Sequence, residues 1–346
     1  MRDGSCVILG CVAHDAFDVT RRQALSFRAA GHGLAVRRPH DELVEAVRPV
    51  GLRRTKNAAR SLAARVEDVT DDDVTDALDD GRLVTFYGPR GTVVLAPPAD
   101  VPLLTAGAAP DGEASLRAAL PGAFVRRLDQ AGMTATDALA AVVGAVRRVL
   151  ASGPLPRGET AMAVTRLLPE ALTPPCRGRC PDRHVEDSLF RLTGVRFHRS
   201  GDVLAAPLDP GPGRPWRTEL VRRYLSCYGP STPKALAAWA GIGRADARAS
   251  LDELDWEVTD AFVDGKKAGV LLTSDSGRLA AAEVKGVRFL PPYDPFLEDR
   301  DRSLLVPSRQ AQKAVWRAAG NPGVVLADGE PVAIWRGDKV TPFEDL

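Results

Sequence analysis

Residues 216–272 read WRTELVRRYLSCYGPSTPKALAAWAGIGRADARASLDELDWEVTDAFVDGKKAGVLL, and this stretch decides the fold. Apolar residues recur at helical spacing in three runs, which are separated by Tyr228–Pro230 and by Gly241–Gly243. Thr232 is expected to cap the second helix, because a proline follows it at the first helical position. Two strands then flank an Asp264-Gly265 turn. Three helices, the last two joined by a glycine turn, followed by a hairpin predict a winged helix.

The chain of 346 residues is long enough for two or three domains, and its charges almost cancel. Its formal net charge is +1, so a surface that binds nucleic acid has to be a local patch. No run approaches the roughly 20 apolar residues that a membrane span needs. The apolar stretch 6–12 follows the acidic Asp3 and precedes His14-Asp15, which is unlike a signal peptide. The five cysteines, an odd number, fit a reducing compartment, so a cytoplasmic protein is predicted.

Helices followed by a hairpin recur in two segments nearer the N-terminus. In the first, helices are predicted over 20–30, 41–50, 58–66 and 71–78, before strands over 83–87 and 92–96. In the second, helices over 134–150, 157–168 and 183–192 precede strands over 195–197 and 203–205. The Pro- and Gly-rich run 207–215 is the clearest linker. The sequence therefore predicts three tandem winged-helix units, over residues 19–108, 109–208 and 214–282.

The two ends of the chain differ from this pattern. Residues 1–18 show no clear periodicity and are expected to be a lead-in. After residue 283 the sequence changes to short β-like runs at 287–290, 324–326 and 332–335. They predict a small C-terminal β-domain over residues 283–346, and the fold class expected for the whole chain is α+β.

Several short motifs, taken in combination, resemble one known family. They are His184–Arg191, Tyr228–Pro233, Leu290–Phe296, Glu298–Asp301, Gly320–Leu326, Asp328–Glu330 and Trp335. Together they resemble the winged-helix DNA-binding family that contains the AlkZ and YcaQ (AlkX) DNA glycosylases, from about Thr20 to Arg336. The resemblance implies three tandem winged helices in a concave arrangement with a C-terminal β-barrel. It also implies excision of bulky 7-alkylguanine adducts, or unhooking of interstrand crosslinks, in double-stranded DNA.

The sequence departs from this family at its catalytic motif. Members carry glutamine–x–glutamine or glutamine–x–aspartate after a Gly-hydrophobic pair, whereas here Gly51-Leu52 is followed by Arg53-Arg54-Thr55. By the resemblance, Arg53 and Thr55 occupy the two catalytic positions. Arginine has no hydrogen-bond acceptor and carries a fixed positive charge, which opposes the positive charge that grows on the sugar as the N-glycosidic bond breaks. The usual catalytic site is therefore predicted to be absent or rebuilt.

Cations gather around this motif. Residues 53–65 hold five of them and no acid: Arg53, Arg54, Lys56, Arg60 and Arg65. Such an entrance to a helix is expected to bind DNA phosphates, each contact adding a salt-dependent increment of affinity. The alternative is a solvated cationic face beside the acidic run 71–80. The residues predicted to contact DNA are Arg54, Lys56, Asn57, Arg60 and, at the tip of the first hairpin, Arg90.

Three other features favour structural roles. The third helix of the 214–282 unit mixes arginines and acids over 244–253, which is typical of a solvated helix with i,i+4 pairs. Cys176, Cys180 and His184 lack a fourth ligand and the usual zinc spacing, so no metal site and no cofactor are predicted. By its chemistry alone Asp294 is a candidate to replace a missing acid or base, but its proline-rich surroundings indicate a rigid turn.

Two functions follow from these observations. The first is a DNA-binding protein of the glycosylase family that recognises damaged or distorted duplex as a monomer. Its base excision is in question because of Arg53 and Thr55. The second is a non-enzymatic winged-helix regulator or damage-binding protein. A regulator usually dimerises on palindromic half-sites, and the sequence contains no long dimerisation helix, which favours the first function.

Overall fold

The computed structural model describes residues 16–53, 57–176, 182–197, 203–206, 213–298 and 301–346. In these residues, helices surround sheets of three, four and six strands, which makes a mixed α+β fold. Along the described chain, no helix combines the length and the apolar character required to cross a bilayer.

The stretch 216–272 forms the helices and the hairpin that its sequence predicts. Its elements are α11 (Gly213–Tyr228), α12 (Pro233–Ala240), α13 (Arg244–Asp252), β8 (Val258–Val263) and β9 (Lys266–Leu272). The Thr232 hydroxyl accepts the Ala235 N–H at 3.3 Å, which caps α12. Gly241 ends this helix in the left-handed conformation, with φ 80°. Asp264 and Gly265 both have positive φ, as a tight two-residue hairpin turn requires.

The first segment also contains its predicted helices and hairpin. Its elements are β1 (Phe17–Val19), α1 (Arg21–Gly31), α2 (Leu43–Val47), β2 (Leu52–Arg53), α3 (Ala58–Ala63), α4 (Asp71–Asp79), β3 (Val84–Tyr87), β4 (Val93–Ala96) and α5 (Val101–Thr105). Thr20 and Gln23 form reciprocal capping bonds at the start of α1. The expected lead-in holds a strand at its end, because β1 pairs in parallel with β8. Residues 1–15 lie outside the described residues.

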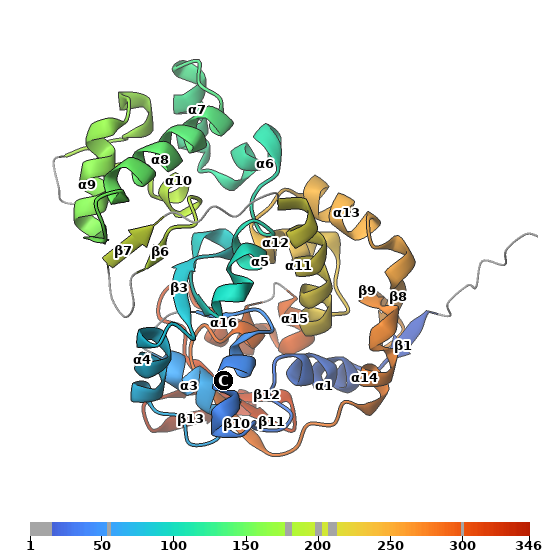
Figure 1. Cartoon of the computed structure of the whole chain (residues 1–346). Helices are drawn as coiled ribbons and strands as arrows, with labels where there is room; N and C mark the ends of the chain where they lie inside the picture. The colour runs from blue at the N-terminus through green and yellow to red at the C-terminus, as the bar shows by residue number, and fades with distance from the viewer. Residues whose placement is uncertain (1–15, 54–56, 177–181, 198–202, 207–212, 299–300) are drawn as a thin grey trace, which may run out of the picture.

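The second segment forms the green lobe that projects at the upper left of Figure 1. Its elements are α6 (Gly112–Ala119), α7 (Gly122–Gln130), α8 (Ala135–Leu150), β5 (Leu155–Pro156), α9 (Arg157–Leu167), α10 (Asp187–Arg191), β6 (Arg196–Phe197) and β7 (Val203–Ala206). Phe86 of β3 pairs with Arg196 of β6, so the hairpins of the first two segments share one six-stranded sheet. Of the predicted linker 207–215, residues 213–215 belong to α11, and the others lie outside the described residues.

The C-terminal part contains an open sheet, so the prediction of a barrel-like domain is wrong for the described residues. Its elements are α14 (Ser276–Ala281), β10 (Val287–Leu290), α15 (Arg302–Leu305), α16 (Arg309–Val315), β11 (Gly323–Ala327), β12 (Glu330–Arg336) and β13 (Lys339–Pro342). The strand order is β10-β11-β12-β13, and the outer strands β10 and β13 do not pair with each other. A closed barrel requires that its first and last strands pair, and these two strands do not.

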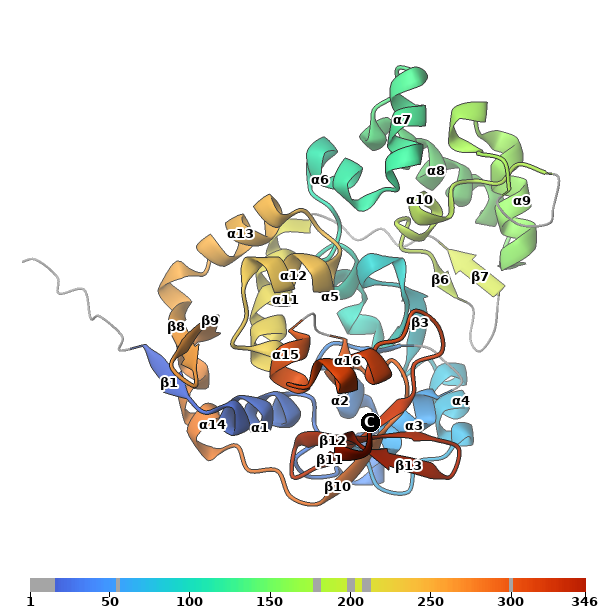
Figure 2. The same ribbon diagram turned by 180° about the vertical axis from the view of Figure 1, so that it is seen from behind.

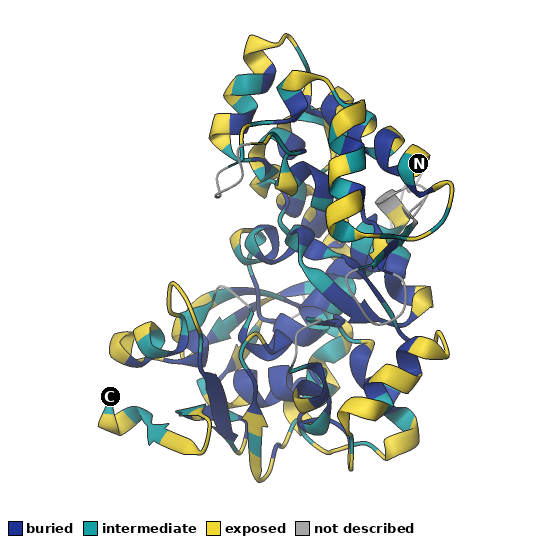
Figure 3. Cartoon of the chain, turned by 90° about the vertical axis from the view of Figure 1, so that its left-hand side faces the viewer, coloured by how far each residue is buried: buried dark blue, intermediate teal, exposed yellow. Residues whose placement is uncertain are grey.

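Shared apolar cores bring segments that are distant in sequence together. One core joins Phe86 and Val94 of the first hairpin to Tyr224 and Trp239 of the third segment. Another joins α1 to β8, β9 and the C-terminal sheet, which lie beside α1 in Figure 2. Figure 3 shows buried segments running through the body of the molecule. A shared core does not locate a domain boundary, so the boundaries 19–108, 109–208, 214–282 and 283–346 stay predictions.

Candidate functional site

Arg53 is held by two residues from the C-terminal part of the chain. It ends β2, whose pairing with β4 places it at the edge of the six-stranded sheet. Its Nη1 lies 3.1 Å from Oε1 of Glu298, a carboxylate that is only 14% exposed. Its guanidinium carbon lies 5.0 Å from the centre of the Tyr293 ring. Tyr293 has φ 65°, an uncommon backbone conformation outside glycine, and such positions occur often at functional sites.

Arg90 contacts the same carboxylate from the first hairpin. It lies in the short turn Pro89–Gly91 with φ 58°, and its Nη2 donates to Oε2 of Glu298 at 2.6 Å. It packs against the end of α12, where a Cβ on Gly241 would lie 2.8 Å from Cγ of Arg90. The arginine therefore lies at the tip of the first hairpin, as the sequence predicts, and this tip packs between two other segments of the chain. Its contact with DNA stays a prediction.

Arg53 and Arg90 border two cavities. The larger has a volume of about 1130 Å³, and the smaller has about 320 Å³. Arg53, Arg90, Thr92 and Tyr293 line both, so these four side chains form the wall between the two spaces. Two guanidinium groups against the single carboxylate of Glu298 leave a surplus of one positive charge in this wall.

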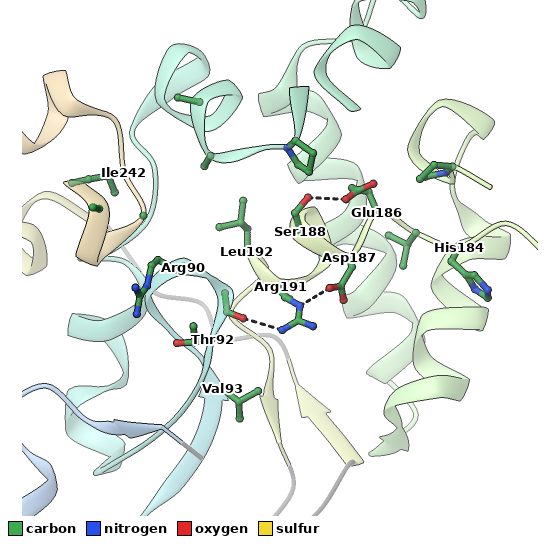
Figure 4. A pocket seen from close by; sticks show the side chains of 18 of the residues that line it. Arg90, Thr92, Val93, His184, Glu186, Asp187, Ser188, Arg191, Leu192 and Ile242 are labelled. Atoms are coloured by element: carbon green, nitrogen blue, oxygen red, sulfur yellow. Dashed lines mark hydrogen bonds and ion pairs between the residues drawn. The ribbon is translucent and has the colours of Figure 1, made fainter. Parts of the chain in front are cut away.

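The opposite side of the larger cavity carries carboxylates from the segment before and within α10 (Figure 4). Asp187 is ion-paired with Arg191 at 2.7 Å and with Arg157 at 3.3 Å. The carboxylate of Glu186 instead accepts a hydrogen bond from the Ser188 hydroxyl at 2.9 Å. Among the described residues, no cation lies within ion-pair distance of Glu186.

The other predicted DNA-binding residues are distributed differently. Arg60 is exposed on α3, and its guanidinium carbon lies 5.7 Å from the centre of the Trp335 ring. Asn57 is half-buried at the start of α3. Thr55, Arg54 and Lys56 lie outside the described residues, so the structure does not place them.

Arg65, counted in the cationic segment, is not a surface cation. It is 1% exposed and forms an ion pair with Asp294, which is fully buried. The suggestion that Asp294 replaces a catalytic acid or base is therefore also wrong, because its two oxygens are engaged by Arg65. Its structural role agrees with the rigid turn that the sequence indicates.

Two other sequence features, the charges of α13 and the cysteine–histidine group, also lie partly or wholly in the described residues. On α13, Arg248 and Asp252 lie 3.9 Å apart and are both well exposed, as in a solvated helix. Cys180 lies outside the described residues, although Cys176 and His184 both line the larger cavity. The described residues contain no group of three or more histidines, cysteines or acids arranged to hold a metal ion.

Sequence reasoning gave no role to Glu298, Tyr293 or Glu186. All three belong to the motifs that carry the family resemblance, and this was the signal available for them. Glu298 and Tyr293 contact residues far away in the chain: Arg90 and Glu298 are 208 residues apart, and Tyr293 lies under Arg53. Spacing along the sequence carries no information about such a pair.

Three comparisons with known proteins agree. A family model described as DNA glycosylase AlkZ-like matches residues 49–341. A curated relative from Streptomyces sahachiroi, described as an interstrand DNA cross-link repair glycosylase, is 33% identical over 168 residues, which are 45% of this chain and 43% of that protein. The matched region thus covers less than half the length of that relative. The solved structure of Streptomyces sahachiroi DNA glycosylase AlkZ has the same fold, with a TM-score of 0.72 and 20% identity over 95% of this chain and 92% of the other. Since the family model covers most of its length, the chain belongs to the DNA glycosylase AlkZ-like family.

Proposed function

We propose that this protein is a DNA glycosylase for duplex DNA that carries bulky alkylated purines or interstrand crosslinks. Family membership supports base excision as the reaction, and the relative described as an interstrand DNA cross-link repair glycosylase supports the substrate class. The proposal includes tandem winged helices over 19–108, 109–208 and 214–282 in a concave arrangement, followed by the β-domain 283–346. A monomer acting in the cytoplasm is expected to bind one damaged site.

The observation that carries this proposal is the convergence of Arg53 and Arg90 on Glu298 between two cavities. The surplus positive charge there is partly buried, so salt screens it less than a charge on the open surface. A planar guanidinium also matches the geometry of a phosphate with two parallel hydrogen bonds. The expected ligand of this pair is a DNA phosphate beside the damaged nucleotide.

The volume of the larger cavity favours a bulky lesion. At about 1130 Å³ it exceeds the roughly 300–1,000 Å³ that is usual for small-molecule pockets. An enzyme that acts on a base inside a duplex commonly takes the nucleotide out of the stack and into such a pocket. The space here is sufficient for an extruded purine together with a large substituent.

Residues near Arg53 extend the proposed phosphate surface. Arg60 is exposed at the surface of α3. Asn57 begins that helix, and Arg54 and Lys56 enter the proposal by their position in the sequence. Each phosphate contact is expected to add to the affinity and to the salt dependence of binding.

A second function is favoured by one observation at the motif position. The fixed charge of Arg53, held against Glu298 and Tyr293, opposes positive charge on a sugar. This arrangement suits a non-enzymatic damage-binding protein or regulator that uses the same pocket without cleaving the glycosidic bond. Thr55 is too short to restore the contacts of the family's second motif residue.

Single-turnover base release tests the first function against the second. The protein, in excess, is incubated with a duplex that contains one 7-alkylguanine, and free base is quantified beside a duplex-only control. Release above that control supports a glycosylase. Binding of the duplex without release supports the damage-binding function and overturns the proposed excision.

Binding measurements test the arginine pair separately. Arg90→Ala is expected to weaken duplex binding and to lower the slope of log affinity against log salt by about 1. Arg248→Ala, which removes an exposed cation from α13, is the matched control and is expected to leave both quantities unchanged. Equal losses in the two variants would contradict the assignment of the phosphate contact to Arg90.

A further inference from the structure

We infer that Glu186 is the catalytic carboxylate of this protein and activates the water that attacks the sugar. The inference rests on the proposed glycosylase function. It answers the question that the family motif leaves open, namely which group performs this task where Arg53 and Thr55 stand in place of the usual residues.

The charges around the two cavities single out Glu186. Three carboxylates border them in the described chain: Glu186, Asp187 and Glu298. Glu298 is held by Arg53 and Arg90, and Asp187 pairs with two other arginines. An arginine partner largely cancels the charge of a carboxylate, which then stabilises a nearby cation poorly. In the part of the chain that the structure describes, the carboxylate of Glu186 is bonded only to the neutral Ser188 hydroxyl, so its charge remains available to the cavity.

The backbone holds Glu186 in place. Its N–H donates to the Leu172 carbonyl at 3.1 Å, and its own carbonyl accepts the Phe190 N–H at 2.9 Å. The Ser188 hydroxyl then orients the side chain, and Figure 4 shows the two side chains directed toward each other at the cavity wall. A base fixed from both sides in this way is pre-organised for proton transfer.

Glu186 and Arg53 lie on separate elements that line one space. A phosphate bound at the Arg53–Arg90 pair would leave the sugar and the extruded base to extend into the cavity. The positive charge that develops at C1′ is then opposed by Arg53 and stabilised by Glu186. The arginine serves DNA binding, and the glutamate serves the chemistry.

The reaction step balances without any added reactant. The C1′–N9 bond of a cationic 7-alkylguanine nucleotide breaks, and its electron pair moves onto the purine, which leaves as the neutral base. The oxygen of a water molecule forms the new bond to C1′, and one of its protons passes to the carboxylate of Glu186. The products are the free base and an abasic hemiacetal, and Glu186 then loses the proton to solvent.

The test compares Glu186→Gln with the wild type in single-turnover release of 7-alkylguanine from a duplex. Glutamine keeps the size of the side chain and an acceptor for Ser188, but it cannot take a proton. Glu186→Ala, measured beside it, also removes the oxygen that could position water. Release is expected to slow by about 100-fold or more, while duplex affinity and thermal midpoint stay within error.

Asp187→Asn reports on the neighbouring ion-paired carboxylate, and its effect on the rate of release is expected to be at least tenfold smaller. Glu45→Gln, on an exposed glutamate of α2, is the control for loss of a charge.

The outcomes separate this inference from the proposed function. If the wild type releases base and Glu186→Gln and Glu186→Ala both release it equally fast, the role of Glu186 is overturned and the glycosylase function stands. If the wild type binds the duplex but releases no base, both are overturned. A slow Glu186→Gln variant that also binds weakly or melts early would overturn the catalytic assignment in favour of a structural role.

Discussion

The guanidinium of Arg65 donates two parallel hydrogen bonds of 2.8 Å to the two carboxylate oxygens of Asp294. Both side chains are buried, and the residues are 229 positions apart in the chain. Arg65 also donates to the carbonyl oxygens of His32 and Ser61 at 2.8 and 2.7 Å. The pair thus links the first segment to the turn that carries Tyr293, which contacts Arg53 in the candidate site.

Removing one partner of this pair is expected to destabilise the protein strongly. Asp294→Ala leaves the buried charge of Arg65 without its partner, which typically costs about 3–5 kcal/mol. Urea unfolding followed by circular dichroism measures the loss. Asp294→Asn retains an acceptor for Arg65 and is expected to cost less. A loss below about 1 kcal/mol in the alanine variant would show that the pair contributes little.

The buried histidine beside this pair gives a prediction for pH. His32 packs edge-on against the rings of Tyr228 and Phe296. Burial, and after it the charges of Arg65, Arg28 and Arg278, hold its pKa well below the ordinary value of 6.5. Below about pH 6.5 the unfolded chain therefore binds a proton at this position that the folded protein does not bind.

Stability is accordingly expected to fall as the pH drops below 6.5 and to gain nothing from this residue above that value. The loss from His32 is at most about 1.4 kcal/mol per pH unit. Urea unfolding at pH 7.5 and 5.5 measures it. The difference between the two pH values is expected to be smaller in His32→Gln, and an unchanged difference would contradict this account.

Local and distant interactions explain which parts of the fold could be predicted from the sequence. The helix that begins after Thr232 and the hairpin at Asp264-Gly265 are specified within a few residues, by a capping hydroxyl and by two positive φ angles. The wrong barrel prediction concerns closure, which depends on the pairing of the outer strands β10 and β13. Nothing in the sequence of either strand determines whether the other reaches it.

The sequence predicted the two arginines of the candidate site but not the glutamate that they contact. The motif position identified Arg53, and the hairpin identified Arg90, but the carboxylate that holds both is more than 200 residues from Arg90. The same limit explains why Arg65 was counted among surface cations. A run of arginines does not reveal which member faces a buried aspartate from another part of the chain.

Gly241 gives a prediction about the position of Arg90. Gly241→Ala places a methyl group 2.8 Å from Cγ of Arg90 and imposes a left-handed conformation on a non-glycine residue. The backbone strain alone costs about 1–2 kcal/mol.

Gly265→Ala is the control, because it imposes the same strain at φ 72° but its methyl group would meet nothing within 4 Å. Both variants are therefore expected to lose stability in urea unfolding, and only Gly241→Ala is expected to lose duplex affinity by displacing Arg90. Equal affinity in the two variants would contradict the assigned contact.

The last prediction concerns the motif itself. Arg53→Gln together with Thr55→Gln restores the family's two glutamines after Gly51-Leu52. The change removes a fixed positive charge and adds amide oxygens that can position water, so base release from a 7-alkylguanine duplex is expected to rise at least tenfold, or about 1.4 kcal/mol of barrier. Duplex affinity is expected to fall, because the Arg53 contact with phosphate is lost. Parallel measurement of release and affinity in both proteins separates the two effects. A variant that releases base more slowly than the wild type would mean that Arg53 takes part in the chemistry and does more than hold the DNA.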